Sequence, residues 1–274
     1  MPGVVCFAVN DMISSLSNDK VKAIRALAER KHRVREGRFV IEGARLIDDA
    51  LAANIQPDWI FCSERLLPRA KATLKRLRSL RVEVIDVSDA VMKACSDTET
   101  PQGLLAVIPL PRLAWPREPK LILIADALRD PGNLGALLRS AAASGVDGVL
   151  LSPETVDAYN PKVVRGAMGA HFRLPILEVD WTSINEHARG TKVYLAAADG
   201  KRVYTDVDWT QPSTLIVGSE AEGASEDAMK LATAHISIPL SREVESLNAA
   251  VAASVILFEA KRQRSIGLGR GERG

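Results

Sequence analysis

LILIADALRDPGNLGALLRSAAASGVDGVLLS (residues 121–152) contains two apolar runs on either side of a helix-forming segment. The runs Leu121–Leu128 and Gly148–Ser152 are largely continuous rather than alternating, which indicates strands covered on both faces. The segment between them, Asp130–Gly145, opens with a glycine-bearing turn and continues as a helix of small residues with Arg139 in its middle. A strand, a helix and a second strand in this order predict an α/β fold with a parallel sheet.

Similar patterns continue toward the C-terminus. We expect a closing helix over about Ser246–Gln263 and three more strands, at Lys192–Ala197, Thr214–Gly218 and His235–Pro239. The sequence therefore predicts a C-terminal domain over residues 120–264. The last ten residues, SIGLGRGERG (265–274), are rich in glycine and arginine and predict a flexible basic tail.

The first part of the chain predicts a smaller α/β domain over residues 1–108. Its expected helices are 18–31, 43–53 and 65–80, and its expected strands are 38–41, 59–63, 82–86 and 104–108. The segment PLPRLAWPREP (109–119) follows, with four prolines in eleven residues. Because proline restricts φ and cannot donate a backbone hydrogen bond, this segment predicts an extended linker between the domains.

Composition is that of a soluble globular protein, with 47% hydrophobic and 26% charged residues among 274. The net charge of +2 indicates no partner by itself, but its distribution is uneven. Residues 20–45 hold nine Lys or Arg against three Glu, and residues 65–81 hold seven with no acid. Two basic helices suggest contact with nucleic acid, and solvated helix faces are the alternative explanation.

Cysteine and histidine patterns argue against a disulfide framework and a metal site. Cys6, Cys62 and Cys95 are odd in number and far apart, and the four histidines lack the spacing of metal ligands. The N-terminal run VVCFAV has no basic segment before it, and no apolar stretch reaches the roughly 18–20 residues of a membrane helix. We therefore predict a cytoplasmic protein without a metal and without a membrane-spanning segment.

The loop after the first strand of the C-terminal domain is the first candidate site. Gly132 and Gly135, with Asn133 between them, do not form the GxGxxG of dinucleotide sites, and no GK[ST] follows. Glycine allows a close approach of the backbone. Arg139 among small residues suggests a nearby phosphate or carboxylate, and a structural ion pair is the alternative.

Two later loops carry further polar residues. VGSEAEGAS (217–225) places Glu220 between two glycines directly after a strand, where a carboxylate can cap a helix, bind a hydroxyl or bind a cation. Ser246 and Asn248 stand at the entry of the closing helix, where Ser246 is either an N-cap or part of a site. Because ligands of parallel α/β proteins collect at the carboxyl ends of strands, these loops are expected to form one site.

Three ordered motifs resemble the SpoU/TrmH-type RNA ribose 2′-O-methyltransferases of the SPOUT class. They are DPGNLGALLRSAAASG (130–145), IVGSEAEG (216–223) and ISIPLSREVESLNAAVAASVILFE (236–259). The first domain resembles the ribosomal-protein-like RNA-binding domain of rRNA-directed members, through RKHRVREGRFVIEGARLIDDAL (30–51) and DTETPQGLLAVI (97–108).

The resemblance implies a parallel-sheet SPOUT domain with a deep trefoil knot, which binds S-adenosylmethionine and forms a homodimer. By position in the motifs, it implies cofactor-binding roles for Gly218, Ile238 and Leu247. It implies catalytic roles for five polar residues, Asn133, Arg139, Glu220, Ser246 and Asn248. Arg139 either accepts the proton of the ribose hydroxyl or stays charged, binds RNA phosphate and stabilises the developing alkoxide.

The resemblance implies RNA as the substrate, with 23S rRNA favoured over tRNA. Two other function classes remain open from the residues alone: an oxidoreductase that uses a dinucleotide, and an RNA-binding module without activity. The missing GxGxxG argues against the first, and the intact NxGxxxR and SLN motifs argue against the second.

Overall fold

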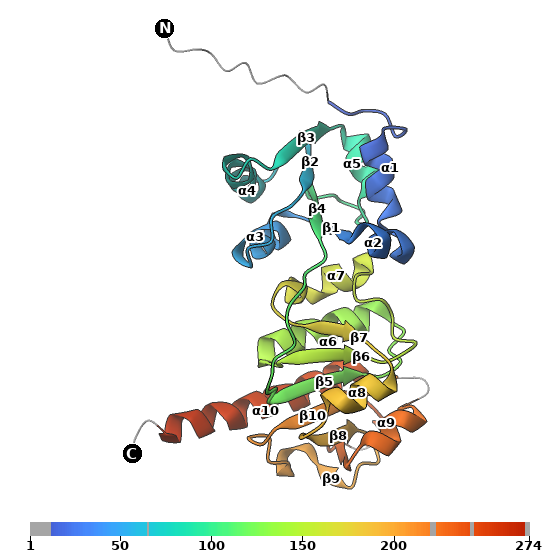
Figure 1. Ribbon diagram of the computed structural model, residues 1–274, viewed down its shortest axis with the longest axis vertical. Coiled ribbons are helices and arrows are strands. Elements are labelled where there is room, and N and C mark those ends of the chain that lie inside the picture. Colours follow the sequence, from blue (N-terminus) through green and yellow to red (C-terminus); the bar gives the residue numbers. More distant parts are fainter. Residues whose placement is uncertain (1–11, 65, 220–222, 242–243, 272–274) are drawn as a thin grey trace. The chain divides into compact units, whose positions relative to one another are not determined.

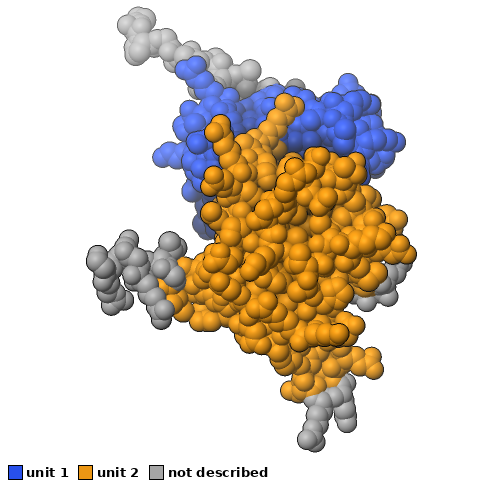
Figure 2. All heavy atoms as spheres, turned by 60° about the horizontal axis from the view of Figure 1, so that its bottom comes forward, with its two compact units in different colours: residues 1–110 blue, residues 111–274 orange. Residues whose placement is uncertain are grey.

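The computed structural model describes residues 12–64, 66–219, 223–241 and 244–271, with side chains up to residue 266. The chain divides into two compact units, Met1–Leu110 and Pro111–Gly274, which are drawn in different colours in Figure 2. Each unit has its own sheet and its own buried core. Among the described helices, none is long and apolar enough to cross a membrane.

The first unit is built around a four-stranded sheet in the order β1-β4-β2-β3. Strand β4 runs antiparallel to both β1 and β2, whereas β2 and β3 are parallel. Helices α1 and α5 contribute Val21, Ile24 and Val91 to the core on one face of this sheet, and α3 contacts α4 (Figure 1). The strands are β1 (Arg38–Glu42), β2 (Trp59–Ser63), β3 (Glu83–Val87) and β4 (Leu104–Pro109); the helices are α1 (Asp19–Ala26), α2 (Arg30–Glu36), α3 (Ala44–Ala52), α4 (Pro68–Ser79) and α5 (Asp89–Cys95).

The single helix predicted over residues 18–31 is wrong, because the chain turns between α1 and α2. The buried guanidinium of Arg33 donates through Nη1 to the carbonyl oxygens of Leu27 and Ala28, both at 2.7 Å. These carbonyls would otherwise be left without partners at the end of α1. A basic residue that was counted as part of a charged helix face therefore has a structural role.

The second unit contains a seven-stranded sheet in the order β7-β6-β5-β10-β8-β11-β9, and all of its strands are parallel. This confirms the predicted α/β class with a parallel sheet and a smaller N-terminal domain. Every residue of the central strands β5 and β10 is buried, as their continuous apolar runs predicted. The strands are β5 (Leu121–Ala125), β6 (Gly148–Leu151), β7 (Ile176–Glu178), β8 (Lys192–Ala196), β9 (Arg202–Val203), β10 (Ser213–Val217) and β11 (Ala234–Ser237).

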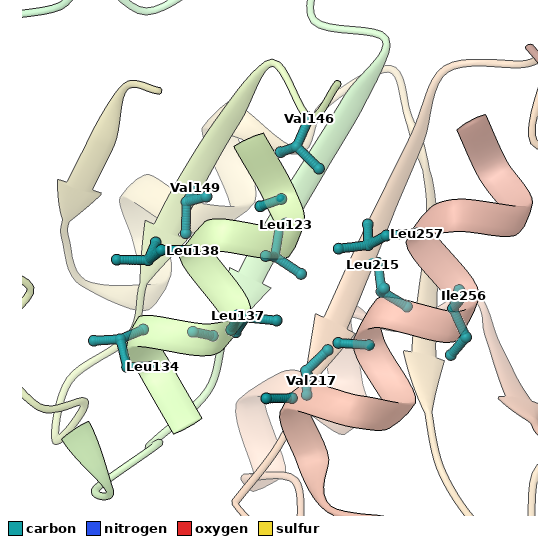
Figure 3. Close-up of a cluster of buried hydrophobic side chains, with 14 of the residues drawn as sticks. Leu123, Leu134, Leu137, Leu138, Val146, Val149, Leu215, Val217, Ile256 and Leu257 are labelled. Carbon is teal, nitrogen blue, oxygen red and sulfur yellow. The ribbon is translucent and has the colours of Figure 1, made fainter. Parts of the chain in front are cut away.

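Helices cover both faces of this sheet (Figure 1). Helices α6 (Pro131–Ser144), α7 (Pro161–Ala167) and α10 (Ala249–Gly271) contribute to the core on one face. Figure 3 shows Leu134 and Leu137 of α6 and Ile256 and Leu257 of α10 in this core beside residues of β5 and β10. Helices α8 (Trp181–His187) and α9 (Glu226–Leu231) cover the other face, and two short 3₁₀ helices span Ala170–Phe172 and Tyr204–Asp206.

Small residues allow close helix contact within the first motif. A Cβ atom at Gly135 in α6 would lie 3.0 Å from both the Cα atom of Gly166 and the carbonyl oxygen of Val163 in α7. That is closer than ordinary van der Waals contact between heavy atoms. The close backbone approach expected at Gly135 is therefore a contact between α6 and α7 inside the unit.

The proline-rich segment and the C-terminal tail differ from their predicted states. Trp115 lies over Gly148, where an added Cβ would come within 2.5 Å of the indole, so much of segment 109–119 packs on the second unit. Helix α10 continues to Gly271, past the predicted boundary at residue 264, and Ser265 donates to the carbonyl oxygen of Lys261. The backbone hydrogen bonds of a helix that already has a buried face offset the low helix propensity of its glycines.

We predict that acid destabilises the protein through His171, which is buried beside Tyr159 with Nε2 donating to the carbonyl oxygen of Ala158 at 2.7 Å. Burial lowers the pKa of His171 to about 4. Above about pH 6.5 the ring is neutral in both states, and as the pH falls from there toward 4 only the unfolded chain gains the proton. The loss is on the order of 3 kcal/mol, measured by urea unfolding at several pH values.

His171→Gln should remove this part of the pH dependence, whereas His235→Gln, at an exposed histidine, should retain it. An unchanged slope in the His171 variant would contradict the assignment.

Candidate active site

A pocket of about 610 Å³ lies at the carboxyl ends of β8, β10 and β11, beside the start of α10. Its volume is within the range of small-molecule sites. The described wall residues come from four parts of the chain: 195–199 at the end of β8, 217–219 with 223–224 at the end of β10, 235–240 at β11, and 246–256 at α10. Of the three loops expected to form one site, those of the second and third motifs meet at this pocket, whereas the loop after β5 reaches only its edge, through Asn133.

The three predicted cofactor-binding residues, Gly218, Ile238 and Leu247, all line this pocket. Gly218 is a glycine because the chain returns on itself directly after it. A Cβ atom at Gly218 would lie 2.7 Å from the carbonyl oxygen of Gly223, whose own amide donates to Ser219 at 2.9 Å. The tight turn keeps the main chain at the pocket wall, where its polar groups can face a ligand.

Ser246 and Asn248 also line the pocket, and Asn248 links two helices. Its Oδ1 accepts from the amides of Ala250 and Val251 at 3.1 and 3.2 Å, which makes it the N-cap of α10. Its Nδ2 donates to Oδ1 of Asn133 at 2.9 Å. The alternative that Ser246 caps the helix is therefore wrong. A cap at Ser246 would require α10 to begin at residue 247, but α10 begins at Ala249.

Asn133 lies in the first turn of α6, where its amide donates to the capping carboxylate of Asp130 at 2.8 Å. It reaches the pocket edge through Asn248, although it is outside the lining itself. Arg139 is exposed on α6 and is also outside the lining. Among the described residues, no carboxylate forms an ion pair with the guanidinium of Arg139. The alternative of a structural ion pair is therefore not supported by this part of the chain. Glu220 lies outside the described residues.

Asp126 is a site-organising residue that the sequence analysis missed. It is buried, and its carboxylate accepts from Oγ of Ser152 at 3.0 Å and from the amide of Ser225 at 2.7 Å. Ser152 in turn accepts from the amide of Ala127 at 3.0 Å. This network joins the loops after β5 and β6 to the start of α9. A single acid directly after the apolar run LILIA was the available signal.

The β8 side of the pocket was also missed. Asp199 and His235 are exposed lining residues, and neither belongs to the three motifs. Gly200 holds this loop against β11, because an added Cβ would lie 2.5 Å from the carbonyl carbon of Ile236. Oγ of Ser237 donates to the carbonyl oxygen of Gly200 at 2.8 Å.

The pocket therefore combines an apolar slot with a few polar groups at its rim. Leu195, Val217 and Ile236 form apolar walls, while Asp199, Ser246 and Asn248 offer polar contacts. Such a site fits a molecule with an apolar ring and polar substituents. Across the described part of the chain, no group of three or more His, Cys, Asp or Glu is arranged to hold a metal ion.

Comparison with known families identifies both units. The SpoU rRNA Methylase family matches residues 120–258, and the MRM3-like substrate binding domain matches residues 18–106.

Individual relatives span most of the chain. The mitochondrial rRNA methyltransferase 3A of Danio rerio is 37% identical over 85% of this chain, which spans 66% of that relative's length. The 23S rRNA (guanosine(2553)-2′-O)-methyltransferase RlmP of Bacillus subtilis is 33% identical, over 91% of this chain and 98% of the relative. The structure of an AdoMet-bound rRNA methyltransferase from Sinorhizobium meliloti is 29% identical with a TM-score of 0.81, covering 92% of this chain and 97% of that one.

The two roles of Asn248 can be separated. Asn248→Ala should lower the free energy of unfolding by about 1–2 kcal/mol, because α10 loses its cap and Asn133 loses a donor. Asn248→Asp also removes the Nδ2 donor but keeps a capping oxygen at the positive end of the helix, so it should be less destabilised than Asn248→Ala by about 1 kcal/mol. Urea unfolding of both variants measures this, and equal destabilisation by the two would contradict the capping role.

Proposed function

Because the chain belongs to the SpoU rRNA methylase family, we propose that it methylates a ribose 2′-oxygen of rRNA with S-adenosylmethionine. The observation that carries this proposal is the convergence of Gly218, Ile238, Leu247, Ser246 and Asn248 on one pocket. These residues come from the second and third motifs, which are up to 30 residues apart in the chain. Relatives named as rRNA 2′-O-methyltransferases cover both units of the chain.

The residues of the pocket fit S-adenosylmethionine. Leu195, Val217 and Ile236 supply an apolar slot for a purine ring, and the main chain at Gly218 approaches without an intervening side chain. Asp199 supplies a carboxylate that can accept from hydroxyl or ammonium groups. When bound, S-adenosylmethionine supplies a methyl group on a positively charged sulfur, which is already reactive toward an oxygen nucleophile. The protein's own task is to align the nucleophile and to manage its proton.

The polar residues at the pocket edge suit this task. Asn248 and Asn133 hold each other at 2.9 Å and can orient a ribose between the starts of α6 and α10. Arg139 either takes the hydroxyl proton or stays charged and stabilises the developing oxyanion. Glu220 and Ser246 are the other two polar residues to which we assign a catalytic role.

We extend the proposal to a homodimer. Helix α10 exposes an apolar stripe at helical spacing, with Val251 50%, Val255 36% and Phe258 47% exposed. Arg139 lies outside the pocket of its own chain, on a neighbouring helix that also exposes Ala136 and Ala143. A second copy packed on α6 and α10 would cover the stripe and could bring its Arg139 to the site.

Three further proposals concern the knot, the RNA substrate and the cellular compartment. The first two rest on family membership and the third on the cysteines. The family implies that the C-terminal part of the sheet is knotted, and that 23S rRNA is favoured over tRNA as the substrate. A reducing compartment, the cytoplasm, accords with Cys62 and Cys95 being free thiols. Burial raises the pKa of both thiols to about 11, so they are poor nucleophiles and have no part in the chemistry.

Arg139→Ala should lower kcat for methyl transfer roughly 100-fold or more, because it removes the cation from the developing charge. Affinity for S-adenosylhomocysteine should remain within a few-fold, since Arg139 is outside the pocket lining. The measurement is transfer of tritiated methyl to unmodified 23S rRNA transcripts, with calorimetry for the cofactor product. Arg189→Ala, at an exposed arginine beyond α8, is the control. Retained turnover in the Arg139 variant would overturn its role, and no transfer by the original protein would overturn the function.

Phe258→Glu should convert the dimer to a monomer, because a carboxylate on the apolar stripe would lose its hydration in the interface. Light scattering after size exclusion measures the mass. Leu80→Glu is the matched control, at a leucine 42% exposed in the first unit. A dimer that persists in the Phe258 variant would show that another surface forms the contact.

A further inference from the structure

The two basic stretches of the first unit differ in how their charges are compensated. Three exposed cations of α1 and α2 pair with nearby acids, at 3.1 Å for Lys22–Asp19, 2.7 Å for Lys31–Glu29 and 2.8 Å for Arg35–Glu36, whereas Arg25 has no carboxylate oxygen within 4.0 Å among the described residues. Lys20 pairs with Glu83 at 2.6 Å, and Arg33 is buried against carbonyl oxygens. The first stretch is therefore largely neutralised within the unit, despite its excess of Lys and Arg.

Helix α4 is different. Its buried face consists of Ala70, Thr73, Leu74 and Leu77. Lys71, Lys75 and Arg78 lie on one flank of its exposed side, at the i, i+4 and i+7 positions of a helical stripe. Within the described residues, none of these three has a carboxylate oxygen within 4.0 Å, whereas Arg69 on the other flank pairs with Asp48 at 3.2 Å. We call Lys71, Lys75 and Arg78 the α4 stripe.

The three cations of the α4 stripe do not stabilise the helix that carries them. Lys71 lies in the first turn, where a cation opposes the helix dipole, and the first turn holds no acid. Like charges three and four residues apart destabilise a helix, and the stripe contains both spacings. A set of cations that repel each other and have no internal partner is suited to an external polyanion.

We infer that the α4 stripe is a docking surface for the phosphate backbone of the substrate RNA, separate from the methyl-transfer site. Cβ atoms one helical turn apart are about 5–6 Å from each other, so successive cations can meet successive phosphates along a strand. Contacts of this kind add affinity and register but do not read sequence. The inference rests on the proposed function, because it takes RNA as the substrate.

The test compares two triple variants of the full chain with equal changes of charge. Lys71→Gln, Lys75→Gln and Arg78→Gln remove the stripe. Lys22→Gln, Lys31→Gln and Arg35→Gln remove two lysines and one arginine that are already paired. Binding of an unmodified 23S rRNA transcript is measured by filter retention without cofactor, at about 50–200 mM KCl.

The stripe variant should bind the transcript at least tenfold more weakly, and the slope of log K against log salt should fall by about 2–3 units, one for each lost phosphate contact. Its kcat at saturating RNA should be unchanged, while KM for RNA rises. The paired-cation variant should stay within about twofold. A charge-conserving variant, with Lys71→Arg, Lys75→Arg and Arg78→Lys, should bind like the original, because phosphate contact here needs charge rather than one side-chain shape.

Unchanged affinity in the stripe variant, or equal weakening in both triple variants, would overturn the inference. An acidic protein as the occupant of α4 would give the first of these results. Failure of the original protein to transfer methyl to rRNA is measured separately and would overturn the proposed function instead. Circular dichroism and thermal unfolding of each variant establish that its helices are intact.

Discussion

Strands β5 and β10 are buried along their whole length on both faces, and the arrangement of the second unit depends on this constraint. Buried backbone groups must be hydrogen-bonded, so these strands require parallel neighbours on either side and helices above and below. Two polar side chains, Ser213 and Thr214, are buried at the start of β10, and others lie directly after the carboxyl ends of the strands. Asp126 stands at such an end, and its bonds to Ser152 and Ser225 set the loops around the carboxyl edge of the sheet.

Contacts between α6 and α10 fix the position of the pocket residues at the start of α10. Asn133 meets Asn248, Oγ of Ser254 donates to Ser140 at 2.7 Å, and Nζ of Lys261 donates to the carbonyl oxygen of Ala143 at 2.8 Å. These polar contacts are spaced along both helices, which also contribute Leu134, Leu137, Ile256 and Leu257 to the buried core (Figure 3). They fix the start of α10, and with it Leu247 and Ser246, against the pocket. The proposed chemistry thus depends on helix packing as much as on the loops.

The first unit separates charge that maintains the fold from charge that is available to a partner. Arg33 and Lys20 use their charges within the unit, through carbonyl oxygens and Glu83. The cations of the α4 stripe have no such use among the described residues. The two proposals assign RNA affinity to α4 in the first unit and methyl transfer to the second unit. That division accords with a separate substrate-binding domain in the family match.

The local sequence pattern by itself predicted most strands of the second unit, the family and part of the site. Apolar runs identified β5, β6, β8, β10 and β11. Three ordered motifs identified the family and five of the residues that line the pocket, but not Asp199 or His235. Only the tertiary structure decided that Asn248 caps α10 while bonding Asn133, because that contact joins residues 115 positions apart. It also decided that the cations of α2 are paired and those of the α4 stripe are not. The sequence gives the number of charged residues. The distance between a cation and a carboxylate, which decides whether they pair, is set by the packing of helices and strands.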